Sequence, residues 1–165
     1  MGPLDEVLFG LARQYARCAE ALLGDELVSV VLFGSVARRQ CRSTSDIDLI
    51  VILRDAPKTS RGRRAILAPV RAELDPALEN LWRDGLFTDF TEVILSMDEA
   101  RKTHRLFLEV IEDGVILYDR NGFFAGVLER LRGALRRMGA QRKTFGNLRY
   151  WDLKPDFKPG DVVEI

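Results

Sequence analysis

The chain has 165 residues, and 47% of them are hydrophobic, which is enough to fill the core of one domain with an extension. Its 25 Lys and Arg residues balance its 25 Asp and Glu residues, so the formal net charge is zero. No global electric field attracts such a protein to a polyanion, and we expect neither nucleic acid nor an anionic membrane as its partner.

The sequence also excludes several kinds of site and compartment. No apolar stretch reaches the length of a membrane span, and the N-terminal MGPLDEVLF carries acids where a secretory signal carries bases, so we expect a cytoplasmic protein. Cys18 and Cys41 are too few for a disulfide framework or a thiolate metal site, and His104 is the only histidine. Zinc sites and histidine-based triads therefore have almost no material here.

The first part of the chain reads as a helix and a strand that ends in a tight turn. Residues 3–23 carry apolar side chains at helical spacing. Residues 28–33 are β-branched and apolar, which predicts a buried strand that ends at Gly34. Residues 36–39 then begin a short helix, so we expect the amides around Ser35 to point outward as donors for an anion such as phosphate.

Two carboxylates head the next apolar run. Asp46 and Asp48 are two residues apart, and in a strand that spacing puts both side chains on one face. Two like charges held close together need a cation between them, and oxygen ligands without nearby His or Cys suit Mg²⁺. The preceding loop carries Arg39 and Arg42, which either meet a triphosphate or are ordinary solvated charges. A phosphate-binding turn beside a magnesium pair indicates nucleotidyl transfer, although either half alone is also explained by an ordinary turn or strand end.

This pattern resembles the signature of the DNA polymerase β-like nucleotidyltransferase superfamily, which is a strand, Gly-Ser, a spacer of about ten residues and Asp-x-Asp in a second strand. Gly34, Ser35, Asp46 and Asp48 match it. The segments GSVAR and SDIDL are similar to those of the small stand-alone members called minimal nucleotidyltransferases. The resemblance implies an α/β (α+β) fold with a small mixed sheet flanked by helices and a C-terminal extension.

The resemblance also implies an enzyme that transfers a nucleoside monophosphate, AMP from ATP, to an acceptor hydroxyl while pyrophosphate leaves. Its cofactors would be two Mg²⁺ ions. Its site residues would be Asp46 and Asp48 as catalytic metal ligands, with Gly34, Ser35, Arg38 and Ser45 beside the nucleotide.

The centre of the chain reads as a helix, a strand and a second helix. Residues 63–82 have a helical pattern that contains Pro69 and Pro76, which predicts a kink or a division into two helices. Residues 87–95 are rich in β-branched and aromatic side chains, which favours a third core strand. A Ser-Met-Asp-Glu capping box then predicts a helix from residue 96 to about residue 112.

The C-terminal part differs in character. Residues 115–118 are an apolar run that predicts an added edge strand, and residues 123–138 form an amphipathic helical pattern. From residue 141 onward the chain has aromatic residues among bases and no helical period, which fits either a nucleotide-binding segment or an arm pinned to the body by Trp151 and Phe157.

We therefore expect a nucleotidyltransferase domain over residues 1–120, with a helix and an extended arm over residues 121–165 packed on the same domain. The predicted edge strand either pairs across a homodimer or is covered by this arm.

The sequence offers two candidates for a third carboxylate of the site. Active members of the superfamily place a third Asp on the next core strand, where it helps to take the acceptor's proton. Here that strand contains Asp89 and Glu92, which differ in parity, while Thr91 falls nearest the usual position. Glu92 lies deeper in the apolar run, where an unpaired charge is costly, and we favour it as the third catalytic residue if the strand bulges. The remaining alternative is that neither acid serves and turnover is poor.

Other functions remain open. Small members of this superfamily commonly partner a small helical protein in toxin–antitoxin pairs, either transferring AMP to it or only occluding it. An antibiotic-modifying nucleotidyltransferase would usually need a further helical substrate domain. A polymerase or RNA-tailing enzyme is disfavoured by the zero net charge.

Overall fold

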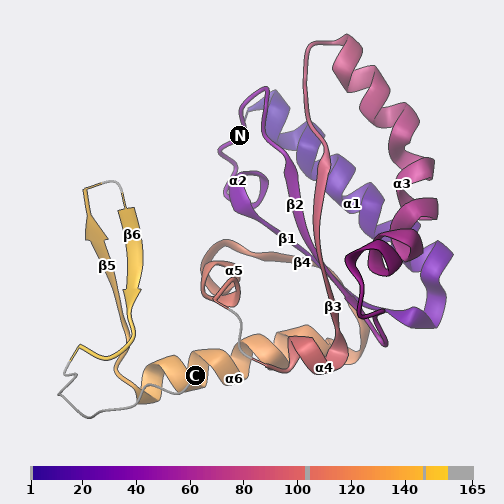
Figure 1. Ribbon diagram of the computed structural model, residues 1–165. Coiled ribbons are helices and arrows are strands. Elements are labelled where there is room, and N and C mark those ends of the chain that lie inside the picture. The colour runs from indigo at the N-terminus through magenta and orange to yellow at the C-terminus, as the bar shows by residue number, and fades with distance from the viewer. Residues whose placement is uncertain (1, 103–104, 147, 156–165) are drawn as a thin grey trace.

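Figure 1 shows the computed structural model, which describes residues 2–102, 105–146 and 148–155. The strands are β1 (Leu27–Phe33), β2 (Ile47–Leu53), β3 (Phe90–Ser96), β4 (Val115–Asp119), β5 (Gln141–Phe145) and β6 (Leu148–Asp152). The helices are α1 (Pro3–Leu23), η1 (Gly24–Glu26), α2 (Gly34–Ala37), α3 (Ser60–Arg83), α4 (Met97–Ala100), α5 (Phe107–Asp113), η2 (Arg120–Gly122) and α6 (Phe123–Arg137).

Four of the strands form one mixed sheet in the order β3-β2-β1-β4, and β5 and β6 form a separate hairpin. β1 pairs antiparallel with β2 and with β4, whereas β2 and β3 are parallel. The parallel pair needs a crossover connection, and α3 supplies it. The α/β fold with a small mixed sheet that the sequence predicts is confirmed.

Helices cover both faces of the sheet (Figure 1). One hydrophobic cluster joins α1 and α3 to alternate residues of the strands, and the other joins α4, α5 and α6 to the residues between them. In β2, for example, Leu49 and Val51 belong to the first cluster and Ile50 and Ile52 to the second. A strand buried on both faces reads as a continuous apolar run, which is why this period-2 alternation is hidden in the sequence.

The helix predicted over residues 63–82 is a single helix, because Pro69 and Pro76 both lie inside α3 and do not divide it. The helix predicted over residues 96–112 is wrong beyond its first turn. Its capping box is present, but α4 ends at Ala100 and α5 begins at Phe107. Both of these residues are fully buried in the same cluster, so tertiary packing overrides the local helical pattern. His104 lies outside the described residues.

β4 is the edge strand that the sequence predicts, and no described residue of the C-terminal hairpin pairs with it. The hairpin projects from the body (Figure 1) and is attached at its base, where Trp151 Nε1 donates to the carbonyl of Leu108 at 3.2 Å. Arg142 and Glu112 form an ion pair there at 3.1 Å. Phe157, the other expected anchor, lies outside the described residues. Across the described ranges, no helix combines the length and apolar character that crossing a bilayer requires.

Candidate active site

The turn between β1 and β2 brings backbone against a carboxylate. Gly34 has φ of 71°, a left-handed conformation that L side chains rarely adopt. A Cβ built at this position would overlap Oδ2 of Asp48, so only glycine lets the two groups approach as they do. Ser35 follows in the first turn of α2, where backbone amides have no acceptor within the helix.

Asp46 and Asp48 lie at the start of β2 on the face covered by α5 and α6. Asp48 is the ladder partner of Phe33 in β1 and of Thr91 in β3, and it shares its face with Ile50. Asp46 is exposed just before the strand, and its Oδ1 accepts the backbone N–H of Asp89 at 3.2 Å. The structure therefore brings the two predicted carboxylates together beside the Gly34–Ser35 turn.

The electrostatics of this pair show an unneutralised site. Burial raises the pKa of Asp48 above its ordinary value, the charge of Asp46 raises it further, Arg38 lowers it and Glu109 of α5 raises it. Among the described residues, no Lys or Arg forms an ion pair with Asp46 or Asp48. Two neighbouring carboxylates without an ion-pair partner in the described part of the chain offer hard oxygen donors, which suit a divalent cation such as Mg²⁺.

The protein groups alone do not enclose such a cation. In the described part of the chain, no cluster of three or more His, Cys, Asp or Glu side chains could hold a metal ion. A cation between Asp46 and Asp48 would therefore complete its coordination with oxygen donors other than a third carboxylate. Triphosphate oxygens and water supply these in magnesium sites that bind nucleotides.

Loop residues near the pair have local partners. The guanidinium of Arg39 lies 3.6 Å from the centre of the Phe9 ring and donates to the carbonyl of Asp5, so this arginine is held against α1. Ser45 Oγ accepts the N–H of Arg42 at 2.9 Å, which closes the turn before Asp46. Of the predicted basic residues, Arg38 is the one whose charge acts on Asp48.

The structure does not bring Glu92 to the carboxylate pair. The β2–β3 register runs without a shift from Ile47 and Phe90 to Leu53 and Ser96, so the bulge that would turn Glu92 toward Asp48 is not present. Glu92 lies on the opposite face, where it forms an ion pair with Arg71 at 2.9 Å. The residue beside Asp48 in β3 is Thr91, which is exposed.

The other candidate acid is also held by this arginine. Asp89 Oδ1 forms an ion pair with Arg71 at 2.6 Å and accepts the N–H of Phe90 at 2.7 Å. Asp89 contacts the Asp46–Asp48 pair through its backbone, whose N–H donates a hydrogen bond to Asp46. Both acids that the sequence offers as a third carboxylate are thus engaged with one cation of α3.

Comparison with known families agrees with this geometry. The family described as "Polymerase beta, Nucleotidyltransferase" matches residues 18–122, which include β1 to β4 and every residue of the candidate site. The chain belongs to this family. It is therefore a nucleotidyltransferase, an enzyme with a nucleotide substrate, and enzymes of this kind generally use a divalent metal.

Individual relatives of the nucleotidyltransferase are distant. A protein of Methanocaldococcus jannaschii, whose name gives it as a candidate protein adenylyltransferase, is 26% identical over 136 residues, 81% of this chain and 87% of its own. A toxin–antitoxin crystal structure with AMP-PNP aligns at 14% identity and a TM-score of 0.47, covering 78% of this chain and 92% of that one. A structure of a tri-AMPylated HEPN toxin with its MNT antitoxin, from Shewanella oneidensis, aligns at 13% identity and a TM-score of 0.44, covering 80% and 92%.

Arg71 was not identified from the sequence as the partner of Asp89 and Glu92 in this nucleotidyltransferase. The signal was present, because Arg71 falls on the buried stripe of α3 formed by Leu67, Val70, Leu74 and Leu78. A charged residue on an apolar stripe needs a buried partner, and Glu92 was the acid in an equally apolar strand. The two exceptions to the hydrophobic pattern together predict their own ion pair.

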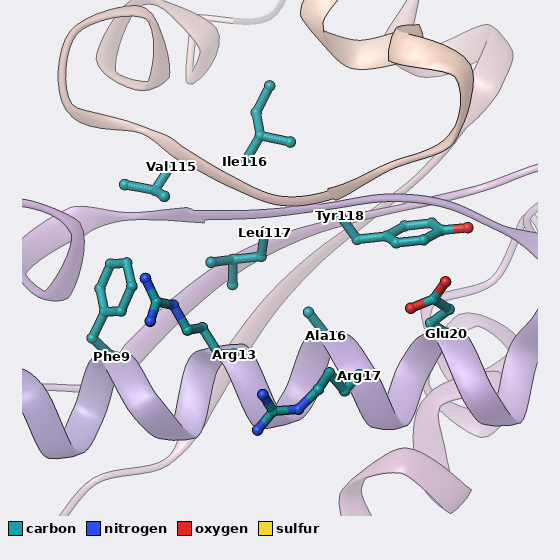
Figure 2. A pocket seen from close by; sticks show the side chains of 9 residues that line it. All are labelled: Phe9, Arg13, Ala16, Arg17, Glu20, Val115, Ile116, Leu117 and Tyr118. Carbon is teal, nitrogen blue, oxygen red and sulfur yellow. The ribbon is translucent and has the colours of Figure 1, made fainter.

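A hollow of the nucleotidyltransferase lies away from the carboxylates, between α1 and the edge strand β4 (Figure 2). It has a volume of about 270 Å³, and Arg13 and Glu20 of α1 point toward the strand in Figure 2. None of the residues predicted for the site from the sequence lines it.

Proposed function

We propose that this nucleotidyltransferase transfers AMP from ATP to a hydroxyl group of a protein acceptor. The observation that carries the proposal is the unneutralised pair of Asp46 and Asp48 beside the turn at Gly34 and Ser35. The relative whose name describes protein adenylyl transfer supports a protein as the acceptor and AMP as the transferred group.

In this proposal each residue has a role that follows from its position. Asp46 and Asp48 would hold Mg²⁺, which when bound as two ions stabilises the attacking and leaving oxygens of an in-line displacement. The backbone amides at Gly34 and Ser35, with the Ser35 hydroxyl, orient the β and γ phosphates by hydrogen bonding. Arg38 supplies positive charge next to Asp48, where the triphosphate would add negative charge.

The proposal assigns Glu92 and the Asp89 side chain no part in the transfer, because both are engaged with Arg71. Ser45 shapes the turn that leads into Asp46. The acceptor enters from the exposed side of Asp46 and Thr91, where solvent reaches the site.

A second candidate function is supported by Thr91. Because the β3 residue beside Asp48 is not an acid, the site has one carboxylate fewer than active members of the superfamily place there. A protein of this kind would bind nucleotide and occlude a small helical partner while transferring AMP slowly.

Labelled ATP distinguishes these functions. The protein is incubated with α-labelled ATP and Mg²⁺ together with purified proteins, RNA or aminoglycosides, and the variant D46N/D48N serves as the blank. We expect label in a protein fraction, released as AMP by phosphodiesterase, and none with the variant. Label in RNA or in an aminoglycoside would overturn the protein acceptor. Tight Mg²⁺-dependent ATP binding with no labelled product would favour the occluding module.

A further inference from the structure

α3 carries two arginines on the side that faces β3. Arg63 and Arg71 are eight residues apart, which is about 12 Å along a helix. Arg63 donates to the carbonyl of Ile94 at 2.6 Å, and Arg71 donates to the carbonyl of Phe90 at 2.9 Å. These carbonyls are four residues apart, about 13 Å along a strand, so an antiparallel helix and strand bring both pairs into register.

The two arginines cover the open edge of β3. Ile47 N–H donates to the carbonyl of Asp89 at 2.8 Å, so that carbonyl points toward β2. Peptide direction alternates along a strand, and the carbonyls of Phe90 and Ile94 therefore point away from β2, toward the edge. An exposed edge attracts other strands, and arginines bonded to its carbonyls remove acceptors from it.

The arginines differ in what else they hold. Arg63 forms a bidentate ion pair with Glu99, at the end of β3 far from the carboxylate pair. Arg71 holds Asp89 at the near end, and the amide of Asp89 is the donor that Asp46 accepts. Two interactions thus link Arg71 to a proposed metal ligand: its ion pair with Asp89, and the hydrogen bond from the Asp89 amide to Asp46. The hydrogen bonds that Arg63 forms with Ile94 and Glu99 do not lead to Asp46 in this way.

Arg71 is itself fixed in place. Its Nη1 lies 2.9 Å and 3.0 Å from the two carboxylate oxygens of Glu92, whose side chain is only 11% exposed. The fully buried Tyr15 donates to the same carboxylate at 3.3 Å, and its ring packs on Phe90 with centroids 4.9 Å apart. A planar guanidinium with acceptors on both Nη atoms has little rotational freedom.

We infer that Arg71 is a positioning residue for the metal site: by holding Asp89 at the start of β3, it fixes the amide that orients the Asp46 carboxylate. This inference rests on the proposed function, because it needs Asp46 to be a metal ligand. It also explains the two acids of β3, which hold the arginine and leave Asp46 and Asp48 free for a cation.

The residues that orient a metal ligand typically contribute about tenfold to hundredfold in metal affinity. Asp89 acts on Asp46 through one amide, so we expect about a tenfold loss of Mn²⁺ affinity when Arg71 releases it. Arg63→Met is the matched control, because it removes an arginine from the same helix, the same carbonyl edge and a comparable ion pair.

The experiment measures Mn²⁺ affinity by electron paramagnetic resonance in the presence of a non-hydrolysable ATP analogue, and thermal unfolding of the same samples. The variants are Arg71→Met, Asp89→Ala, the double variant of both, Arg63→Met and Asp46→Asn. Asp89 is 52% exposed, so its variant folds without a buried charge left behind. If Arg71→Met does not fold, the double variant R71M/E92Q is used in its place, because it also removes the buried Glu92 charge that Arg71→Met leaves without a partner.

We expect Arg71→Met and Asp89→Ala each to weaken Mn²⁺ binding about tenfold, the double variant to lose no more than either, and Arg63→Met to stay within about twofold. The positioning role alone would be overturned if Arg71→Met bound Mn²⁺ as tightly as Arg63→Met while Asp46→Asn bound it more weakly. Unchanged binding in Asp46→Asn would instead overturn the proposed metal site.

Discussion

Four carboxylates lie in or directly before two neighbouring strands of this protein, β2 and β3, and they form two contrasting pairs. Asp89 and Glu92 share the guanidinium of Arg71, whereas Asp46 and Asp48 have no ion-pair partner among the described residues. Burial and like charge raise the pKa of Asp48.

The difference teaches how to separate structural acids from functional ones. Acids that pair with an arginine or lysine of the protein have a structural role. Acids without such a partner are candidates for binding a cation that is not part of the chain. The sequence distinguishes these pairs poorly, because in both the acids stand among apolar residues. Four substitutions test the contrast.

The largest effect is expected for Asp48→Asn, which keeps the side-chain shape and removes a charge. Transfer should fall by at least about a hundredfold to a thousandfold, the scale for losing one group that stabilises transition-state charge. Since the pKa of Asp48 is raised in the folded state, its ionised form is disfavoured there, and the variant should be as stable as the parent or more so without metal. Labelled-ATP assays and thermal unfolding measure both, and a large loss of stability would contradict the assignment.

Gly34→Ala should come next. The added Cβ meets Asp48 Oδ2, and the positive φ strains any L residue, so the carboxylate must move. We expect transfer to fall about tenfold to a hundredfold and stability to fall by about 1–3 kcal/mol. Gly24→Ala is a matched control, because Gly24 also has positive φ, 52°, but open space at the Cβ position. Equal losses of transfer in both variants would show that strain, not the contact with Asp48, is responsible.

Glu92→Gln tests the pair that is bound to Arg71, and it should affect stability more than transfer. It leaves Arg71 with Asp89 but removes the buried half of the ion pair, so stability should fall by about 1–3 kcal/mol. Transfer per folded molecule should remain within about twofold, because Glu92 faces α1 and α3. Chemical denaturation and initial rates give the two numbers. A stable variant that has lost transfer but binds Mn²⁺ as tightly as the parent would restore Glu92 as the third catalytic acid, because loosening of Arg71 would weaken Mn²⁺ binding as well.

The smallest effect concerns Glu99, the partner of Arg63. Hydrogen bonds from Arg63 and from the Ser96 backbone lower the pKa of Glu99 from 4.5 to about 2. A lowered pKa stabilises the fold above pH 4.5, and this contribution disappears as the pH falls toward 2. Glu99 is 37% exposed, so solvent screening keeps the contribution below about 1 kcal/mol. Glu99→Gln should therefore be slightly less stable than the parent at pH 7 and equal to it near pH 2, as followed by thermal unfolding.

Much of this architecture is predictable from local pattern. The turn at Gly34, the carboxylates Asp46 and Asp48 and the edge strand follow from glycine placement and short apolar runs, which are signals that span only a few residues. The break after Ala100 does not follow from that pattern, because it depends on contacts between elements distant in sequence. The pairing of Arg71 with Glu92 is marked by two exceptions to the hydrophobic pattern, but its geometry also depends on α3 packing against β3.

The C-terminal hairpin is a second feature that the local sequence pattern did not predict. The sequence of aromatic and basic residues without helical period fits either a nucleotide-binding segment or an extended arm, and neither interpretation predicts a hairpin. The structure turns it back on itself and pairs Arg142 with Trp151 and Lys143 with Tyr150. Gly146, at the turn, has φ of 59°, a conformation that favours glycine, so the residue type at this position is a local signal for the reversal.

The parallel pairing of β2 with β3 has a consequence for the order of folding. β1 and β2 are antiparallel and close in sequence, so they can pair early, whereas β3 joins only after residues 54–89 have looped back. Closing that loop costs chain entropy before any contact compensates for it. Asp46 therefore meets the amide of Asp89 only at the step that adds β3. A partly folded chain would hold Asp46 and Asp48 without their final orientation, and metal affinity would report the completion of folding.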